Sequence, residues 1–144
     1  MVPLLIGVEG DAGHVAFAHR ALATNGFSPA EVTIHHAIAA AEEGVALFPR
    51  QDVAGVSWGL EPVLRPSAAE RAAAARDGRY MELPVRSLAA LAETEGGVDL
   101  VHIDIQGGEA DLTRKIHEAV WGAQTAGAWR VGGGTIAFDP CRRW

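Results

Sequence analysis

The sequence predicts an α/β fold with a mostly parallel sheet and flanking helices. Short apolar runs that are typical of buried strands alternate with segments whose apolar residues recur at helical spacing. The clearest strand is Val98–Ile105, which is rich in β-branched and apolar residues. Because alternating strands and helices form βαβ units, we expect the strands to run parallel and to present their carboxyl ends at one edge of the sheet.

Composition narrows the class of protein. The chain has 144 residues, 49% of them hydrophobic and 21% charged, which indicates one globular domain at most. Its 18 acidic and 12 basic side chains give a formal charge of −6, so a nucleic-acid partner is not expected. No apolar run is long enough to span a bilayer and no secretory signal precedes the first strand, so we predict a cytoplasmic protein with no membrane partner.

The N-terminal part is expected to form a strand, a helix and two further strands. Pro3–Val8 is a continuous apolar run typical of a strand buried on both faces. Asp11 is placed to cap a helix, which Asn25–Gly26 should end because both residues tolerate the left-handed conformation. Glu31–Ala39 and Val45–Phe48 are the next predicted strands.

The middle of the chain contains one irregular stretch, Pro49–Pro66, followed by more regular patterns. Ser67–Glu70 matches a capping box, so the alanine-rich segment up to Arg76 is predicted to be helical. Tyr80–Val85 is a predicted strand, and Ser87 is placed to cap the helix after it.

Glu9 is the first candidate site residue. It follows a buried strand and precedes a helix, where a carboxylate can accept hydrogen bonds from both hydroxyls of a ribose. The alternative, which the local pattern alone favours, is that Glu9 or Asp11 only stabilises the helix N-terminus, where negative charge is favourable.

Asp104 is the second candidate. It interrupts an apolar strand, and an isolated buried charge there would cost several kcal/mol or more, so the carboxylate must be paired or lie at a solvated cleft. The turn that follows contains Gly107 and Gly108, and Glu109 adds a second carboxylate. An Asp that only caps the turn remains an equal alternative.

No metal site is predicted. His35 and His36 are adjacent, so in a strand they point to opposite faces and cannot bind one ion together. Cys141 is the single cysteine, which leaves no cluster of cysteine and histidine and no internal disulfide.

Several of these segments together resemble the FkbM family of methyltransferases. The strongest match is Val98–Leu112, with the sequence VDLVHIDIQGGEADL, and the resemblance extends over Leu4–Arg114. It implies an incomplete class I, Rossmann-like methyltransferase fold in residues 1–120, followed by an irregular tail rich in Gly and Trp in residues 121–144. The other matching segments are Ile6–Asp11, Asn25–Gly26, His35–Ile38, Gly44–Phe48 and Ser57–Gly59.

The same resemblance implies S-adenosylmethionine as the cofactor. Glu9 would hold its ribose, and Ala37 and Ile38 would lie near its adenine. The remaining residues implied to lie beside the cofactor are Asp104, Gln106 and Gly107.

The implied reaction is transfer of a methyl group to a hydroxyl oxygen of a sugar or a secondary metabolite, so the expected partner is a small-molecule or glycan acceptor. Asp104 or Glu109 would accept the proton of that hydroxyl.

One departure from the family affects these expectations. The family begins with a strand and a glycine-containing loop, whereas only Met1–Pro3 precede the strand of Glu9. We therefore expect a truncated chain that lacks this unit and has open sheet edges through which it can self-associate. Two other interpretations stay open: a catalytically inactive remnant or nucleoside-binding module, and an unrelated α/β binding domain.

Overall fold

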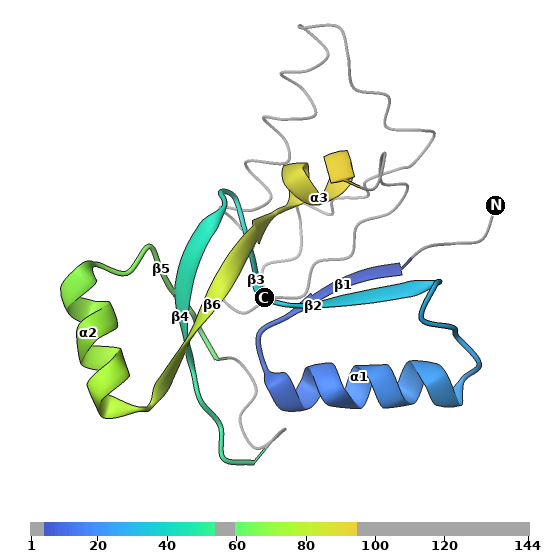
Figure 1. Cartoon of the computed structure of the whole chain (residues 1–144), viewed down its shortest axis with the longest axis horizontal. Helices are drawn as coiled ribbons and strands as arrows, with labels where there is room; N and C mark the ends of the chain where they lie inside the picture. Colours follow the sequence, from blue (N-terminus) through green and yellow to red (C-terminus); the bar gives the residue numbers. More distant parts are fainter. Residues whose placement is uncertain (1–4, 54–59, 95–144) are drawn as a thin grey trace, which may run out of the picture.

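The computed structural model describes residues 5–53 and 60–94. In this part of the chain, the strands form two sheets, and the helices are interspersed among them with four consecutive strands between α1 and α2 (Figure 1). The predicted strand Val98–Ile105 lies outside the described residues. The elements are β1 (Leu5–Glu9), α1 (Ala12–Thr24), β2 (Val32–His36), β3 (Ile38–Ala40), β4 (Gly44–Pro49), β5 (Val63–Leu64), α2 (Ala68–Asp77), β6 (Tyr80–Ser87) and α3 (Leu88–Thr94).

The first three elements form a βαβ unit. β1 and β2 pair in parallel, and the register runs from Leu5 opposite Val32 to Glu9 opposite His36. The predicted caps of α1 are confirmed: a carboxylate oxygen of Asp11 accepts a hydrogen bond from the backbone N–H of His14, and Gly26 follows the C-cap with a φ of 86°. The chain can therefore turn sharply into and out of α1.

The second sheet has the strand order β3-β6-β4-β5 and is mixed. β3 and β6 are parallel, but β4 is antiparallel to both β6 and β5. The α/β class is thus confirmed, while the expectation of a mostly parallel sheet is wrong for the described residues, in which two of the four strand pairings are antiparallel. The reason is the short link Ala41–Glu43 between β3 and β4, because a parallel crossover needs about a dozen residues or more.

The predicted strand Glu31–Ala39 is divided in the structure into β2 and β3, with a bend at Ala37. The N–H of Ala37 donates to the carbonyl oxygen of Glu9 at 3.0 Å, which extends the pairing with β1 by one bond. β3 then pairs with β6 in the other sheet. One continuous segment therefore connects the two sheets.

The main hydrophobic cluster lies on the four-stranded sheet. Gly10, just after β1, is buried against it, because a Cβ at this position would lie 2.8 Å from Ile38 Cδ1 and 3.0 Å from Phe48 Cε2. The βαβ unit thus contacts the core through a residue without a side chain. The cluster consists of Ile38, Ala46, Phe48, Leu83 and Val85.

The other two helices begin as predicted. Ser67 and Glu70 form a reciprocal capping box at the start of α2, and Gly78 ends that helix in the left-handed conformation. Ser87 Oγ accepts a hydrogen bond from the N–H of Ala90 in the first turn of α3. Across residues 5–53 and 60–94, none of the helices has the length and apolar character needed to cross a bilayer.

Candidate functional site

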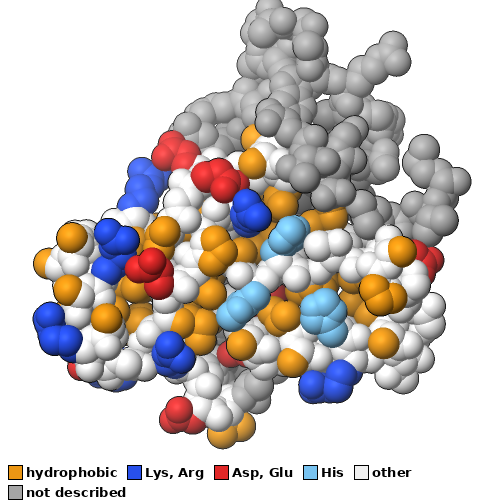
Figure 2. Space-filling view, in the orientation of Figure 1, with side chains coloured by type: hydrophobic (Ala, Val, Ile, Leu, Met, Phe, Trp, Pro, Cys, Tyr) orange, Lys and Arg blue, Asp and Glu red, His pale blue; other side chains and the backbone are white. Residues whose placement is uncertain are grey.

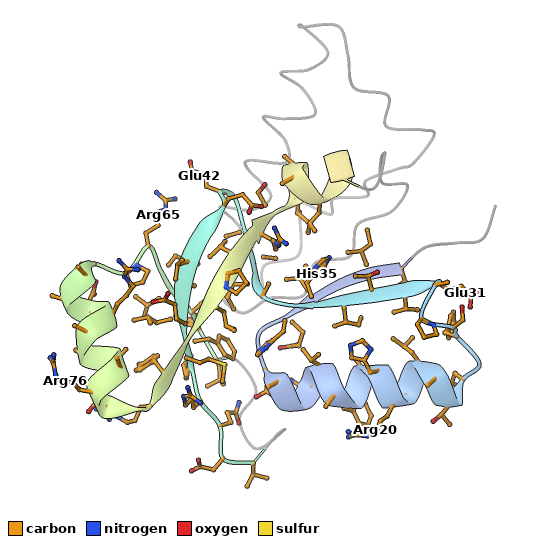
Figure 3. The ribbon with its side chains drawn as sticks, viewed as in Figure 1. Arg20, Glu31, His35, Glu42, Arg65 and Arg76 are labelled. Carbon is orange, nitrogen blue, oxygen red and sulfur yellow. The ribbon has the colours of Figure 1, made fainter. Side chains whose placement is uncertain are left out.

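A hollow of about 340 Å³ lies between α1 and the two strands of the parallel sheet. Figure 3 shows the side chains of this region between the ribbon of α1 and those of β1 and β2. Backbone and apolar side chains form most of the lining, and Glu9 and His14 supply its ionisable groups. The lining residues are Gly7, Val8, Glu9, His14, Phe17, Ala18 and Ile34.

Glu9 is the last residue of β1, and its carboxylate is fixed on one side. Oε1 accepts a hydrogen bond of 2.7 Å from the backbone N–H of Asp11, and Oε2 lies 3.9 Å from His14 Nδ1. About 40% of the Glu9 side chain remains exposed. The hydrogen bond from Asp11 agrees with a role for Glu9 in starting α1. The exposed part of the Glu9 carboxylate can still accept hydrogen bonds from other donors.

The structure brings Ala37 next to Glu9, because the backbone N–H of Ala37 donates a hydrogen bond to the carbonyl oxygen of Glu9. Ala37 and Ile38 are both buried. The Ile38 side chain belongs to the core of the four-stranded sheet and contacts the space beside Gly10. A ligand at this corner would therefore meet the backbone of these residues before it met the Ile38 side chain. Their contact with adenine stays a prediction.

The other predicted site residues are Asp104, Gln106, Gly107 and Glu109, and all of them lie outside the described residues. The structure therefore describes the Glu9 part of the predicted site and leaves the predicted acceptor part untested. Their assigned roles, and that of Glu9 toward a ribose, stay predictions.

His14 is a site residue that the sequence pattern did not indicate. It lies in the first turn of α1, and its ring reaches back toward the carboxylate of Glu9 at the end of β1. The short connection between strand and helix could have indicated this contact. A side chain in the first helical turn covers the backbone N-terminal to it, which here is the end of the strand that carries Glu9. Figure 2 shows histidine side chains among hydrophobic ones on the face of the molecule that is turned to the viewer.

The two adjacent histidines of β2 have different surroundings. His36 Nε2 lies 3.0 Å from the carbonyl oxygen of Gly10, whereas Figure 3 shows His35 on the side of β2 away from α1. Within residues 5–53 and 60–94, no group of three or more His, Cys, Asp or Glu residues could hold a metal ion.

A second hollow, of about 250 Å³, lies at the N-terminus of α1 and reaches the four-stranded sheet. Asp11 and Asp52 supply its carboxylates, and Phe48 and Met81 line it on the side of the sheet. The start of α1 thus borders two hollows, of which only the first is lined by Glu9.

Comparison with curated proteins finds a similar sequence. The chain is 40% identical over 110 residues to a protein of Jannaschia sp. (strain CCS1) named "Putative methyltransferase". The aligned part is 76% of this chain and 39% of the relative, so the chain spans about two fifths of the relative's length. No family model matches the chain, and no solved structure matches it. Membership of the FkbM family therefore stays a prediction.

Proposed function

We propose that this chain is part of a methyltransferase of the FkbM type that uses S-adenosylmethionine, with Glu9 as the residue that binds the cofactor ribose. The observation that carries the proposal is the 40% identity to the Jannaschia protein over most of this chain. The position of Glu9 at the carboxyl end of a parallel strand supports it, because open α/β sheets bind ligands outside that edge.

The residues around Glu9 fit a nucleoside. A carboxylate that accepts one backbone hydrogen bond through Oε1 can still accept bonds from both hydroxyls of a ribose. The neighbouring hollow of about 340 Å³ lies within the range of small-ligand sites, and its mostly apolar lining is typical of them. Gly7 and Gly10 add no open space to this hollow, because a Cβ on Gly7 would lie 2.7 Å from Ile34 Cδ1 and a Cβ on Gly10 would lie 2.8 Å from Ile38 Cδ1.

The chemistry would follow from positioning. S-adenosylmethionine, when bound, supplies a methyl group activated by a positively charged sulfur. The residues of this chain would hold a hydroxyl acceptor in line with that methyl group, since correct positioning lowers much of the barrier. Asp104 or Glu109 would take the hydroxyl proton, and the acceptor would be a sugar or a secondary metabolite.

A second candidate function is nucleoside binding without methyl transfer. It needs only the described part of the candidate site, because Glu9 and the hollow of about 340 Å³ are the features that would hold a nucleoside. The same Glu9 site would then bind the cofactor or its nucleoside part. Transfer of a labelled methyl group from S-adenosylmethionine to sugar acceptors separates the two functions.

Calorimetric titration with S-adenosylmethionine tests the cofactor site. We expect the wild-type chain to bind and Glu9→Gln to bind roughly 10- to 100-fold more weakly, because hydrogen bonds to a charged group contribute about 1.5–3 kcal/mol. Glu42→Gln is the matched control, since Glu42 lies in the turn before β4, away from α1 (Figure 3), and only approaches Arg65 at 3.7 Å.

Two results would contradict the proposal. If the folded wild-type chain does not bind S-adenosylmethionine, the proposed cofactor is wrong. If Glu9→Gln and Glu42→Gln bind it with equal affinity, Glu9 does not bind the ribose. Far-ultraviolet circular dichroism of each variant establishes that the protein compared is folded.

A further inference from the structure

We propose that His14 is a positioning residue for Glu9, and that its protonated ring competes with the ribose hydroxyls for the carboxylate. The inference rests on the proposed function and adds a dependence on pH to that site. Nucleoside binding should weaken as the pH falls through the range in which histidine side chains gain a proton.

The geometry places the His14 ring beside Oε2 of Glu9, the carboxylate oxygen that a ribose hydroxyl would use. Oε1 of Glu9 is engaged by the N–H of Asp11 at 2.7 Å, so Oε2 is the oxygen with less backbone contact. Oε2 lies 3.9 Å from His14 Nδ1, and both side chains line the same hollow. A small rotation of the imidazole would bring its nitrogen within hydrogen-bond distance of the oxygen that a ribose hydroxyl would use.

Both side chains are accessible enough to exchange this partner for a ligand. His14 is 31% exposed and Glu9 is 40% exposed, so water and a nucleoside can reach the pair. Partial exposure also limits the strength of the ion pair, because solvent screens it. We therefore expect a moderate competition that tunes affinity and does not abolish binding.

Other titratable groups near the pair could produce a similar pH dependence. Asp11 caps α1 and accepts a hydrogen bond from the backbone N–H of His14. On β2, His36 is the register partner of Glu9, and its ring contacts the carbonyl oxygen of Gly10. β3 carries only Ile and Ala, and His19 on α1 is exposed. Substitutions of His36 and His19 are thus the necessary controls.

The test is calorimetric titration with 5′-methylthioadenosine from pH 6 to pH 8.5. This nucleoside has both ribose hydroxyls and no group that titrates in this range. For the wild-type chain we expect a Kd roughly two- to fivefold higher at pH 6 than at pH 8, which corresponds to the strength of a partly exposed ion pair. In His14→Gln the Kd should be nearly independent of pH, whereas His19→Gln and His36→Gln should keep the wild-type dependence.

The possible failures are distinguishable. If the folded wild-type chain binds neither S-adenosylmethionine nor 5′-methylthioadenosine, the proposed function itself is wrong. If it binds with an affinity that does not change with pH, or if His14→Gln keeps the dependence, the role of His14 is overturned while the nucleoside site stands. Loss of the dependence in His36→Gln alone would overturn it as well. His14→Asn, with a shorter amide side chain, is a second variant in which the Kd should also be nearly independent of pH.

Discussion

The two sheets differ in how well they are buried. The four-stranded sheet carries the main hydrophobic cluster, including Ala46, which is fully buried. In the β1–α1–β2 unit, α1 has no buried residue, and Phe17 is 64% and Leu5 45% exposed. The elements that carry the candidate site are therefore the less buried ones, which is the usual location of ligand-binding segments.

This difference explains why the hollow beside Glu9 persists. Apolar side chains of α1 do not close over β1, so Phe17 and Ala18 line an open space. At the other end of the unit, Gly10 packs closely against Ile38 and Phe48. The βαβ unit is thus attached firmly at the Gly10 end and loosely packed along α1.

The largest expected effect is on stability, and it compares the loss of a phenylalanine ring in each of the two regions. Phe48→Ala should lower the free energy of unfolding by about 3–5 kcal/mol, because the ring is buried in the cluster. Phe17→Ala, at a side chain that is 64% exposed, should change it by less than about 0.5 kcal/mol. Urea denaturation followed by circular dichroism measures both. Equal losses in the two variants would contradict the contrast in burial.

A smaller effect tests the attachment of the two regions. Gly10→Ala should destabilise the protein by about 1–3 kcal/mol, because the new Cβ would lie 2.8 Å from Ile38 Cδ1 and the neighbours must shift. Gly44→Ala is the matched control, since a Cβ there meets nothing within 4 Å among the described residues. Urea midpoints compare the two variants. A Gly10→Ala protein as stable as Gly44→Ala would show that the close packing at Gly10 is absent in solution.

The elements that the sequence predicted correctly are those that depend on near neighbours in the chain. Asp11 at the start of α1 and Ser67 with Glu70 at the start of α2 form hydrogen bonds within three residues. Gly26, which was predicted to end α1, takes a positive φ angle just after that helix. Such contacts can be read from a short stretch of sequence because they need no distant partner.

The features that the sequence did not predict depend on distant pairing. The short link Ala41–Glu43 makes β4 run opposite to β3, but the sheet becomes mixed only because β6 inserts between these two strands from more than 30 residues further along the chain. The division of Glu31–Ala39 follows from the same cause, since β2 pairs with β1 and β3 pairs with β6. In the candidate site, the position of Glu9 could be predicted because the apolar run before it marks the end of a strand. Its contact with His14 could not be predicted from that run, because that contact depends on the direction in which α1 leaves β1.

The smallest expected effect concerns α2, which contributes only Ala74 to the buried residues. Ser67→Ala should cost about 1 kcal/mol, because it removes one half of the capping box. Hydrogen bonds from the Ser67 side chain, and then from its backbone, lower the pKa of Glu70 from its ordinary value of 4.5. A lowered carboxyl pKa in the folded state contributes stability above the unfolded value, and that stability is lost as the pH falls through the folded value.

Urea midpoints at pH 7 and pH 3 should therefore differ less in Ser67→Ala and Glu70→Gln than in the wild-type chain. Glu42→Gln, whose carboxylate is only 3.7 Å from Arg65 on the surface, is the control and should keep the wild-type difference. Because α2 packs on β6 of the four-stranded sheet, neither capping variant should change nucleoside binding by the Glu9 site at pH 7. A change in binding would mean that the two regions are coupled more tightly than their contacts at Gly10 indicate.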